Sequence, residues 1–128
     1  MKRRNLILGA LASGVGMTHV VAQTAAKKLP RIVAISNGDE AGYRPARESV
    51  VTGMHALGQI EGRTYRLEIM YANREPLRAV GLIADAVASR PDILLVAGLT
   101  NAKRARDATT TIPVVVATSS NLVDAGVI

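Results

Sequence analysis

Two kinds of apolar pattern alternate along this chain of 128 residues from residue 31 onward. Short apolar runs that contain β-branched residues occupy 31–36, 92–97 and 112–117, and over 64–71 Tyr65, Leu67, Ile69 and Tyr71 alternate with Arg66, Glu68 and Met70. Such segments are typical of β-strands. The uninterrupted run at 92–97 indicates a parallel strand covered on both faces, and the alternation at 64–71 predicts a strand near the edge of the sheet.

Between these segments, apolar residues recur every three or four positions, which is typical of amphipathic helices. The spacing predicts helices over 45–57, 76–89 and 102–109, and Pro45 and Pro76 suit the first turn of the first two. We expect the second helix to present an apolar stripe made of Val80, Ile83, Ala84 and Val87. Strands and helices in this order predict an α/β fold in which a parallel sheet carries helices on both faces, as in a Rossmann-like lobe.

The loops that follow the strands carry the candidate ligand-binding residues. Right-handed crossovers place these loops at one edge of a parallel sheet, where open α/β sheets bind their ligands. Three of the loops carry polar side chains, and the first two also contain glycine: Ser36, Asn37 and Gly38; Gly98, Thr100 and Asn101; Thr118, Ser119 and Asn121. Their hydroxyl, amide and backbone N–H groups suit a small polar ligand. The second loop precedes a helix, so its N–H groups and the helix dipole favour a carboxylate.

Each of these loops also has a simpler interpretation. Asn37–Gly38 followed by Asp39 is an ordinary turn with a helix N-cap. Thr100 or Asn101 can serve only to cap the following helix, and Ser119–Asn121 has a common loop composition. Three polar loops at one sheet edge nevertheless favour a binding site more strongly together than apart.

Charge and composition exclude several classes of function. The formal net charge of +6 falls to +3 once residues 1–22 are removed, and no aromatic residues interleave with the basic ones, so a nucleic-acid partner is not expected. The basic residues Lys103, Arg104 and Arg106 are interpreted as a solvated helix face. The chain has no cysteine, no Gly-x-Ser-x-Gly elbow and no phosphate-binding glycine-rich loop. We therefore expect no enzymatic activity, no cofactor and no metal site.

The first residues predict export. Lys2–Arg4 is followed by a mostly apolar run over 5–17 and by Val20–Ala22, a pattern typical of a cleavable signal peptide over 1–22. The run is shorter than the roughly 20 residues of a membrane-spanning helix. We expect general secretion, with twin-arginine export as the alternative, and then a polar leader over 23–30.

Several stretches together resemble one protein family. They are the basic leader ending in Val-Ala-Gln, Arg31–Ser36, Leu57–Glu68, Tyr71–Ala72, Ile83–Val87, Pro91–Gly98 and Ala108–Val116. In this register the chain resembles the N-terminal part of an ABC-transporter solute-binding protein, from the family similar to the tryptophan- and tyrosine-binding members. The resemblance implies the first lobe of a type I periplasmic-binding fold. It also implies that Tyr71 matches a family aromatic that can lie against a ligand ring, although packing on an edge strand explains Tyr71 equally well.

The resemblance implies a function as well as a fold. We expect a periplasmic solute-binding component that captures an amino acid or similar small carboxylate and delivers it to an ABC permease in the inner membrane. Residues 31–128 would be the N-terminal lobe, with the second lobe missing, because Leu122–Ile128 reads as an apolar helix that has been cut. The alternatives are an α/β module that senses a small molecule and a truncated copy without function.

Overall fold

The computed structural model describes residues 28–128. Both the predicted signal peptide over 1–22 and residues 23–27 of the polar leader lie outside the described residues. Among residues 28–128, no helix is long and apolar enough to cross a membrane.

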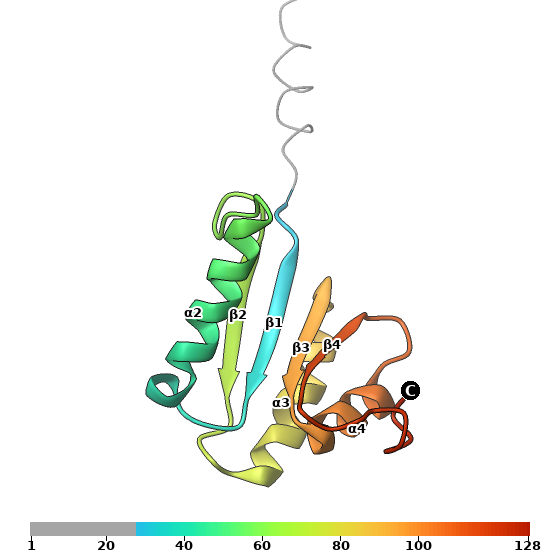
Figure 1. Cartoon of the computed structure of the whole chain (residues 1–128). Coiled ribbons are helices and arrows are strands. Elements are labelled where there is room, and N and C mark those ends of the chain that lie inside the picture. Colours follow the sequence, from blue (N-terminus) through green and yellow to red (C-terminus); the bar gives the residue numbers. More distant parts are fainter. Residues whose placement is uncertain (1–27) are drawn as a thin grey trace, which may run out of the picture.

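A four-stranded parallel sheet forms the centre of the molecule (Figure 1). In spatial order its strands are β2 (Arg66–Tyr71), β1 (Arg31–Ser36), β3 (Ile93–Ala97) and β4 (Val114–Ala117). Every neighbouring pair is parallel, which confirms the predicted sheet. The position of β2 at one edge confirms the interpretation of its alternating pattern.

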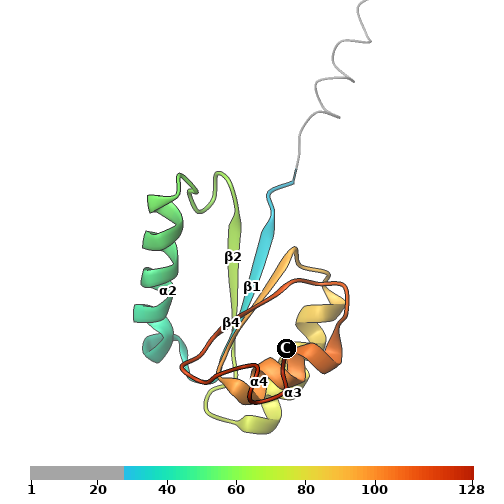
Figure 2. The same cartoon turned by 45° about the vertical axis from the view of Figure 1, so that its right-hand side comes forward.

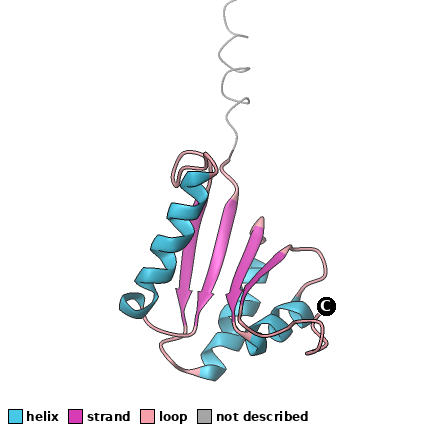
Figure 3. Cartoon of the chain, viewed as in Figure 1, coloured by secondary structure: helices cyan, strands magenta, loops and turns pink. Residues whose placement is uncertain are grey.

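Helices cover both faces of the sheet, as predicted (Figures 2 and 3). The helix α2 (Glu40–Ala56) connects β1 to β2 and lies on one face, whereas α3 (Pro76–Ala88) and α4 (Leu99–Ala108) lie on the other. Right-handed crossovers that leave the centre in opposite directions put their helices on opposite faces. Since β1 leads outward to β2 and β3 leads outward to β4, the direction of winding reverses between β1 and β3.

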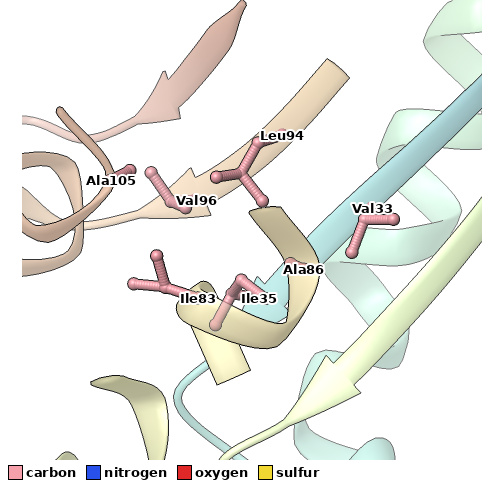
Figure 4. Close-up of a cluster of buried hydrophobic side chains, with 7 residues drawn as sticks. All are labelled: Val33, Ile35, Ile83, Ala86, Leu94, Val96 and Ala105. Carbon is pink, nitrogen blue, oxygen red and sulfur yellow. The ribbon is translucent and has the colours of Figure 1, made fainter. Parts of the chain in front are cut away.

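The core lies between the sheet and the pair α3 and α4 (Figure 4). Alternate residues of the two central strands point into it, because successive side chains of a strand face opposite ways. The cluster consists of Val33, Ile35, Ile83, Ala86, Leu94, Val96 and Ala105. On α3 the buried positions are Ala79, Ile83 and Ala86, so the predicted stripe is wrong at Val80, which is 46% exposed, and at Ala84, which is also exposed.

The opposite face is covered less completely. The helix α2 has no fully buried residue, and its Tyr43 meets Tyr71 of β2 edge to face with ring centroids 6.3 Å apart. An apolar cavity of about 380 Å³ separates α2 from β3 and β4, lined among others by Val50 and Leu95. Beyond it Val115 of β4 is 49% exposed.

Two predicted helix starts are too late in the chain. The helix α2 begins at Glu40 rather than at residue 45, because the side chain of Asp39 accepts a hydrogen bond from the N–H of Gly42 (2.8 Å) and caps it. The helix α4 begins at Leu99 rather than at residue 102, so the predicted loop residues Thr100 and Asn101 belong to its first turn.

The C-terminal residues form turns instead of the predicted helix-like end. The side chain of Asn121 accepts the backbone N–H groups of Val123 and Asp124. Gly126 then adopts a φ of 69°, which interrupts any helix, and the carbonyl of Gly126 accepts a hydrogen bond from Arg106 (2.5 Å). Val127 is thereby buried at 7% exposure.

Arg31 connects several elements at the amino-terminal ends of the strands. Its guanidinium donates two hydrogen bonds to the Glu68 carboxylate (3.0 and 2.9 Å) and one to the backbone carbonyl of Ser89 (2.9 Å). The backbone N–H of Arg31 donates to Asp92 (2.7 Å). One residue thus joins β1 to β2, to the end of α3 and to the start of β3.

This ion pair predicts a loss of stability in acid. Hydrogen bonds from Arg31 lower the pKa of the Glu68 carboxyl below its ordinary value. The stabilisation is therefore complete above the unfolded-state pKa of about 4.3 and is lost as the pH falls through the lower pKa of the folded state. Because the Glu68 side chain is 45% exposed, solvent screening keeps the contribution below about 1 kcal/mol.

Urea unfolding at several pH values between 7 and 3 measures this effect. We expect Glu68→Gln to be less stable than the parent at pH 7 and the difference to shrink below about pH 4.3. Glu48→Gln is the matched control, because Glu48 is exposed on α2 and makes no ion pair among the described residues. A difference that stays constant across this range would contradict the assignment.

Candidate functional site

A cavity of about 300 Å³ with both polar and apolar lining residues opens at the carboxyl ends of the strands. It lies where the loops after β1 and β3 meet the first turns of α3 and α4. This is the point at which the direction of winding reverses, and open α/β sheets bind ligands in the crevice at that point. Four of the predicted site residues line the cavity: Asn37, Gly98, Thr100 and Asn101.

The loop after β1 reaches the cavity through one residue. Ser36 is 3% exposed, and its hydroxyl accepts the N–H of Gly38 (3.1 Å), so this pair shapes the turn and neither residue lines the cavity. Asn37, between them, carries its side chain towards α4 and accepts a hydrogen bond there. Ser36 and Gly38 therefore form the turn and Asp39 caps the helix, as the simpler interpretation predicts, whereas Asn37 lines the cavity.

Gly98 allows the chain to turn sharply from β3 into α4. Its φ of 82° lies in the left-handed region, which favours glycine, and it precedes α4 without any side-chain cap bond. The simpler interpretation, in which Thr100 or Asn101 caps the helix, is therefore wrong: both lie inside it. The first N–H groups of a helix have no partner within the helix, so those of α4 are available at the cavity wall.

Asn101 is the most deeply buried polar residue of the site. It is 2% exposed, and its Nδ2 donates to Oδ1 of Asn37 (2.7 Å). Its own Oδ1 accepts from Nη1 of Arg104 (3.2 Å), and the same Nη1 donates to the carbonyl of Pro76 (3.3 Å). A chain of hydrogen bonds thus links the loop after β1, the first turn of α4 and the first turn of α3.

Three charged residues of the cavity wall were not predicted from the sequence: Arg74, Glu75 and Arg104. Arg104 lies one helical turn after Asn101, on the same face of α4. The interpretation of Arg104 as part of a solvated helix face is therefore wrong. The spacing of Arg104 from Asn101 was the signal that could have found it. Lys103 and Arg106 do lie exposed, as expected.

Arg74 and Glu75 enter the wall because the loop after β2 turns back towards β1. Arg74 has a φ of 66°, and its N–H donates to the carbonyl of Asn37 (2.7 Å), which holds the two loops together. The next residue, Glu75, precedes α3 without a side-chain cap bond. Nothing in the local sequence pattern indicates this approach, since it depends on the packing of two loops.

The other predicted residues lie elsewhere. Tyr71 packs on Tyr43 at the end of β2, away from this cavity, and burial raises the pKa of Tyr43 above its ordinary value. Thr118, Ser119 and Asn121 follow β4 but do not line the cavity. The Thr118 hydroxyl accepts the N–H of Ser120 (3.0 Å), so this loop is engaged in its own turns. Their role in ligand binding stays a prediction.

Solved structures with the same fold include a substrate-binding protein. A conserved domain protein from Vibrio cholerae O1 biovar El Tor is 24% identical, with a TM-score of 0.68 over 79% of this chain and 34% of that one. The ligand-free, open structure of a substrate-binding protein with adhesive properties from Clostridium difficile is 18% identical, with a TM-score of 0.65 over 77% of this chain and 33% of that one.

A third solved structure was determined with an amino acid bound. The ABC domain from Streptococcus pneumonia in complex with L-Trp is 14% identical, with a TM-score of 0.58 over 74% of this chain and 32% of that one. The chain therefore spans about a third of the length of these three proteins. No protein-family model matches the chain, and no curated protein matches it. At these identities the likeness shows the fold, and it confirms the predicted α/β fold of the periplasmic-binding kind.

Proposed function

We propose that residues 31–128 are the first ligand-binding lobe of a solute-binding protein that captures an amino acid or a similar small carboxylate. The observation that carries this proposal is the cavity at the winding reversal between β1 and β3, with Asn37, Asn101 and Arg104 joined around it. The fold shared with a substrate-binding protein supports it, and a further solved structure of this fold, an ABC domain, holds L-Trp.

The wider setting belongs to the same proposal. The basic start at Lys2–Arg4 and the small residues at Val20–Ala22 support export to the periplasm. A solute-binding protein delivers its ligand to an ABC permease, and it closes a second lobe over the ligand. The chain spans about a third of the length of the three solved structures. The second lobe and the permease are therefore part of the proposal. The role is binding, without catalysis or a cofactor.

The cavity chemistry fits a zwitterion. The first N–H groups of α4 favour a carboxylate, because the start of a helix carries partial positive charge. Glu75 lines the same cavity, and its carboxylate makes no ion pair among the described residues, so it can receive an ammonium group. An amino acid satisfies both ends.

Titration calorimetry on two variants of the chain tests the location of the site. Thr100 is exposed at the cavity wall, and Thr100→Ala should weaken binding of an amino acid about tenfold by removing a hydrogen bond worth about 1.4 kcal/mol. Lys103→Ala is the matched control, because Lys103 is exposed on the same helix and does not line the cavity. If Lys103→Ala loses the amino acid while Thr100→Ala keeps it, the cavity is not the site.

A further inference from the structure

Arg104 is held at the cavity wall by only one of its nitrogens. Its Nη1 donates to Asn101 Oδ1 (3.2 Å) and to the Pro76 carbonyl (3.3 Å). Within residues 28–128, Nε and Nη2 make no hydrogen bond. Since a guanidinium carries five N–H donors in a rigid fork, anchoring at Nη1 leaves three of them for a further acceptor.

The anchor fixes where those free donors lie. Asn101 cannot turn its amide without breaking the short bond to Asn37 (2.7 Å), and Asn101 is 2% exposed. The carbonyl of Pro76 belongs to the first turn of α3, so it does not move independently of the helix. Arg104 itself is half-buried, and partial removal from water strengthens its attraction for a negative charge. The guanidinium is therefore pre-positioned before any ligand arrives.

Arg104 also lacks a negative partner in the described part of the chain. The other arginine of the cavity wall, Arg74, lies 3.8 Å from the Asp39 carboxylate, whereas no carboxylate lies within 4.0 Å of Arg104. Both groups that Nη1 contacts are neutral carbonyl oxygens. A half-buried guanidinium with neutral anchors, free donors and a cavity in front of it is suited to an oxyanion from outside the chain.

We propose that Arg104 is the specificity-determining residue of this cavity and selects ligands that carry an oxyanion, either a carboxylate or a phosphate. This inference rests on the proposed ligand-binding function. The planar fork can bind two oxygens of the anion side by side through Nε and Nη2 while Nη1 keeps its bonds to α3 and α4. A lysine cannot do both, because its single ammonium is a point charge without a fork.

The first arm of the test uses the unmodified full chain and matched probes. Titration calorimetry compares L-tryptophan with tryptamine, which lacks the carboxylate, and with indole-3-propionate, which lacks the ammonium. A second set compares L-glutamate, γ-aminobutyrate and glutarate, and inorganic phosphate is measured separately. We expect at least one compound with an oxyanion to bind and tryptamine not to bind. Binding of phosphate alone would identify the anion as phosphate.

The second arm uses variants of Arg104 with the probe that binds best. We expect Arg104→Ala to weaken its binding at least tenfold and Arg104→Lys to recover only part of the loss, while Lys103→Ala leaves affinity unchanged. Circular dichroism checks that each variant is folded. If Arg104→Ala is unfolded, Arg104→Gln takes its place, because a glutamine amide can still donate to Asn101.

The outcomes separate the two proposals. Unchanged affinity in folded Arg104 variants, or tryptamine binding as tightly as L-tryptophan, overturns the role of Arg104 and leaves the ligand-binding function standing. If no probe of either set and no phosphate binds the unmodified chain, the proposed function falls, and the inference about Arg104 falls with it.

Discussion

Replacing Ile83 by alanine is expected to lower the free energy of unfolding by about 2–5 kcal/mol. Ile83 is 1% exposed and lies on α3 among the side chains of β1, β3 and α4 that form the core (Figure 4). The substitution removes three carbon atoms from a closely packed site, so the loss includes both transfer free energy and the cavity that remains. Helix propensity works the other way, since alanine favours helices more than isoleucine does, but by less than 1 kcal/mol.

Urea unfolding followed by circular dichroism measures this loss. Leu77→Ala is the matched control, because Leu77 also lies on α3 but is 85% exposed, and its truncation should change stability by no more than about 0.5 kcal/mol. Equal losses in the two variants would mean that the sheet face against α3 is not the core of the protein.

Replacing Asn101 by alanine is expected to lower the free energy of unfolding by about 1–3 kcal/mol. The buried amide bonds to Asn37 on one side and to Arg104 on the other, so its removal leaves Oδ1 of Asn37 without this donor and leaves Nη1 of Arg104 with the Pro76 carbonyl alone. Buried polar groups that lose their partners cost more than the bond itself contributed. Thr100→Ala should have little effect on stability, because Thr100, the residue before Asn101, makes no side-chain hydrogen bond among the described residues.

A double-mutant cycle shows whether the loss comes from the link between the two loops. Asn37→Ala and the double variant are unfolded in urea beside the single Asn101→Ala variant. We expect a coupling free energy of at least 0.5 kcal/mol, as for residues in direct contact. Strictly additive losses would show that the Asn37–Asn101 bond does not hold the loops after β1 and β3 together.

The candidate site could be predicted only in part. Asn37, Gly98, Thr100 and Asn101 were found because polar residues after strands mark the carboxyl edge of a parallel sheet. The loop after β4 is also rich in polar residues but does not line the cavity, because β4 is an edge strand and the cavity lies on the far side of its neighbour β3, between β1 and β3. Composition cannot report that distance.

Arg104 is a cavity residue that the sequence did not predict. Its neighbours Lys103 and Arg106 suggested a wholly solvated face, yet α4 begins three residues before its predicted start. That earlier start places Asn101 and Arg104 one turn apart inside the helix, where they meet. The residue at which a helix begins depends on the backbone conformation just before it, here that of Gly98 with a φ of 82°.

The sequence by itself determined the order of strands and helices, the parallel sheet and the edge position of β2, because apolar periodicity is a local property that each segment carries alone. Only the tertiary structure decided the strand order β2-β1-β3-β4, the stripe by which α3 packs, and the residues around the cavity. Asn37 and Asn101 are 64 residues apart in the chain and meet only because β1 and β3 are neighbours in the sheet. Contacts of that kind depend on how whole elements pack, and no short stretch of sequence contains that information.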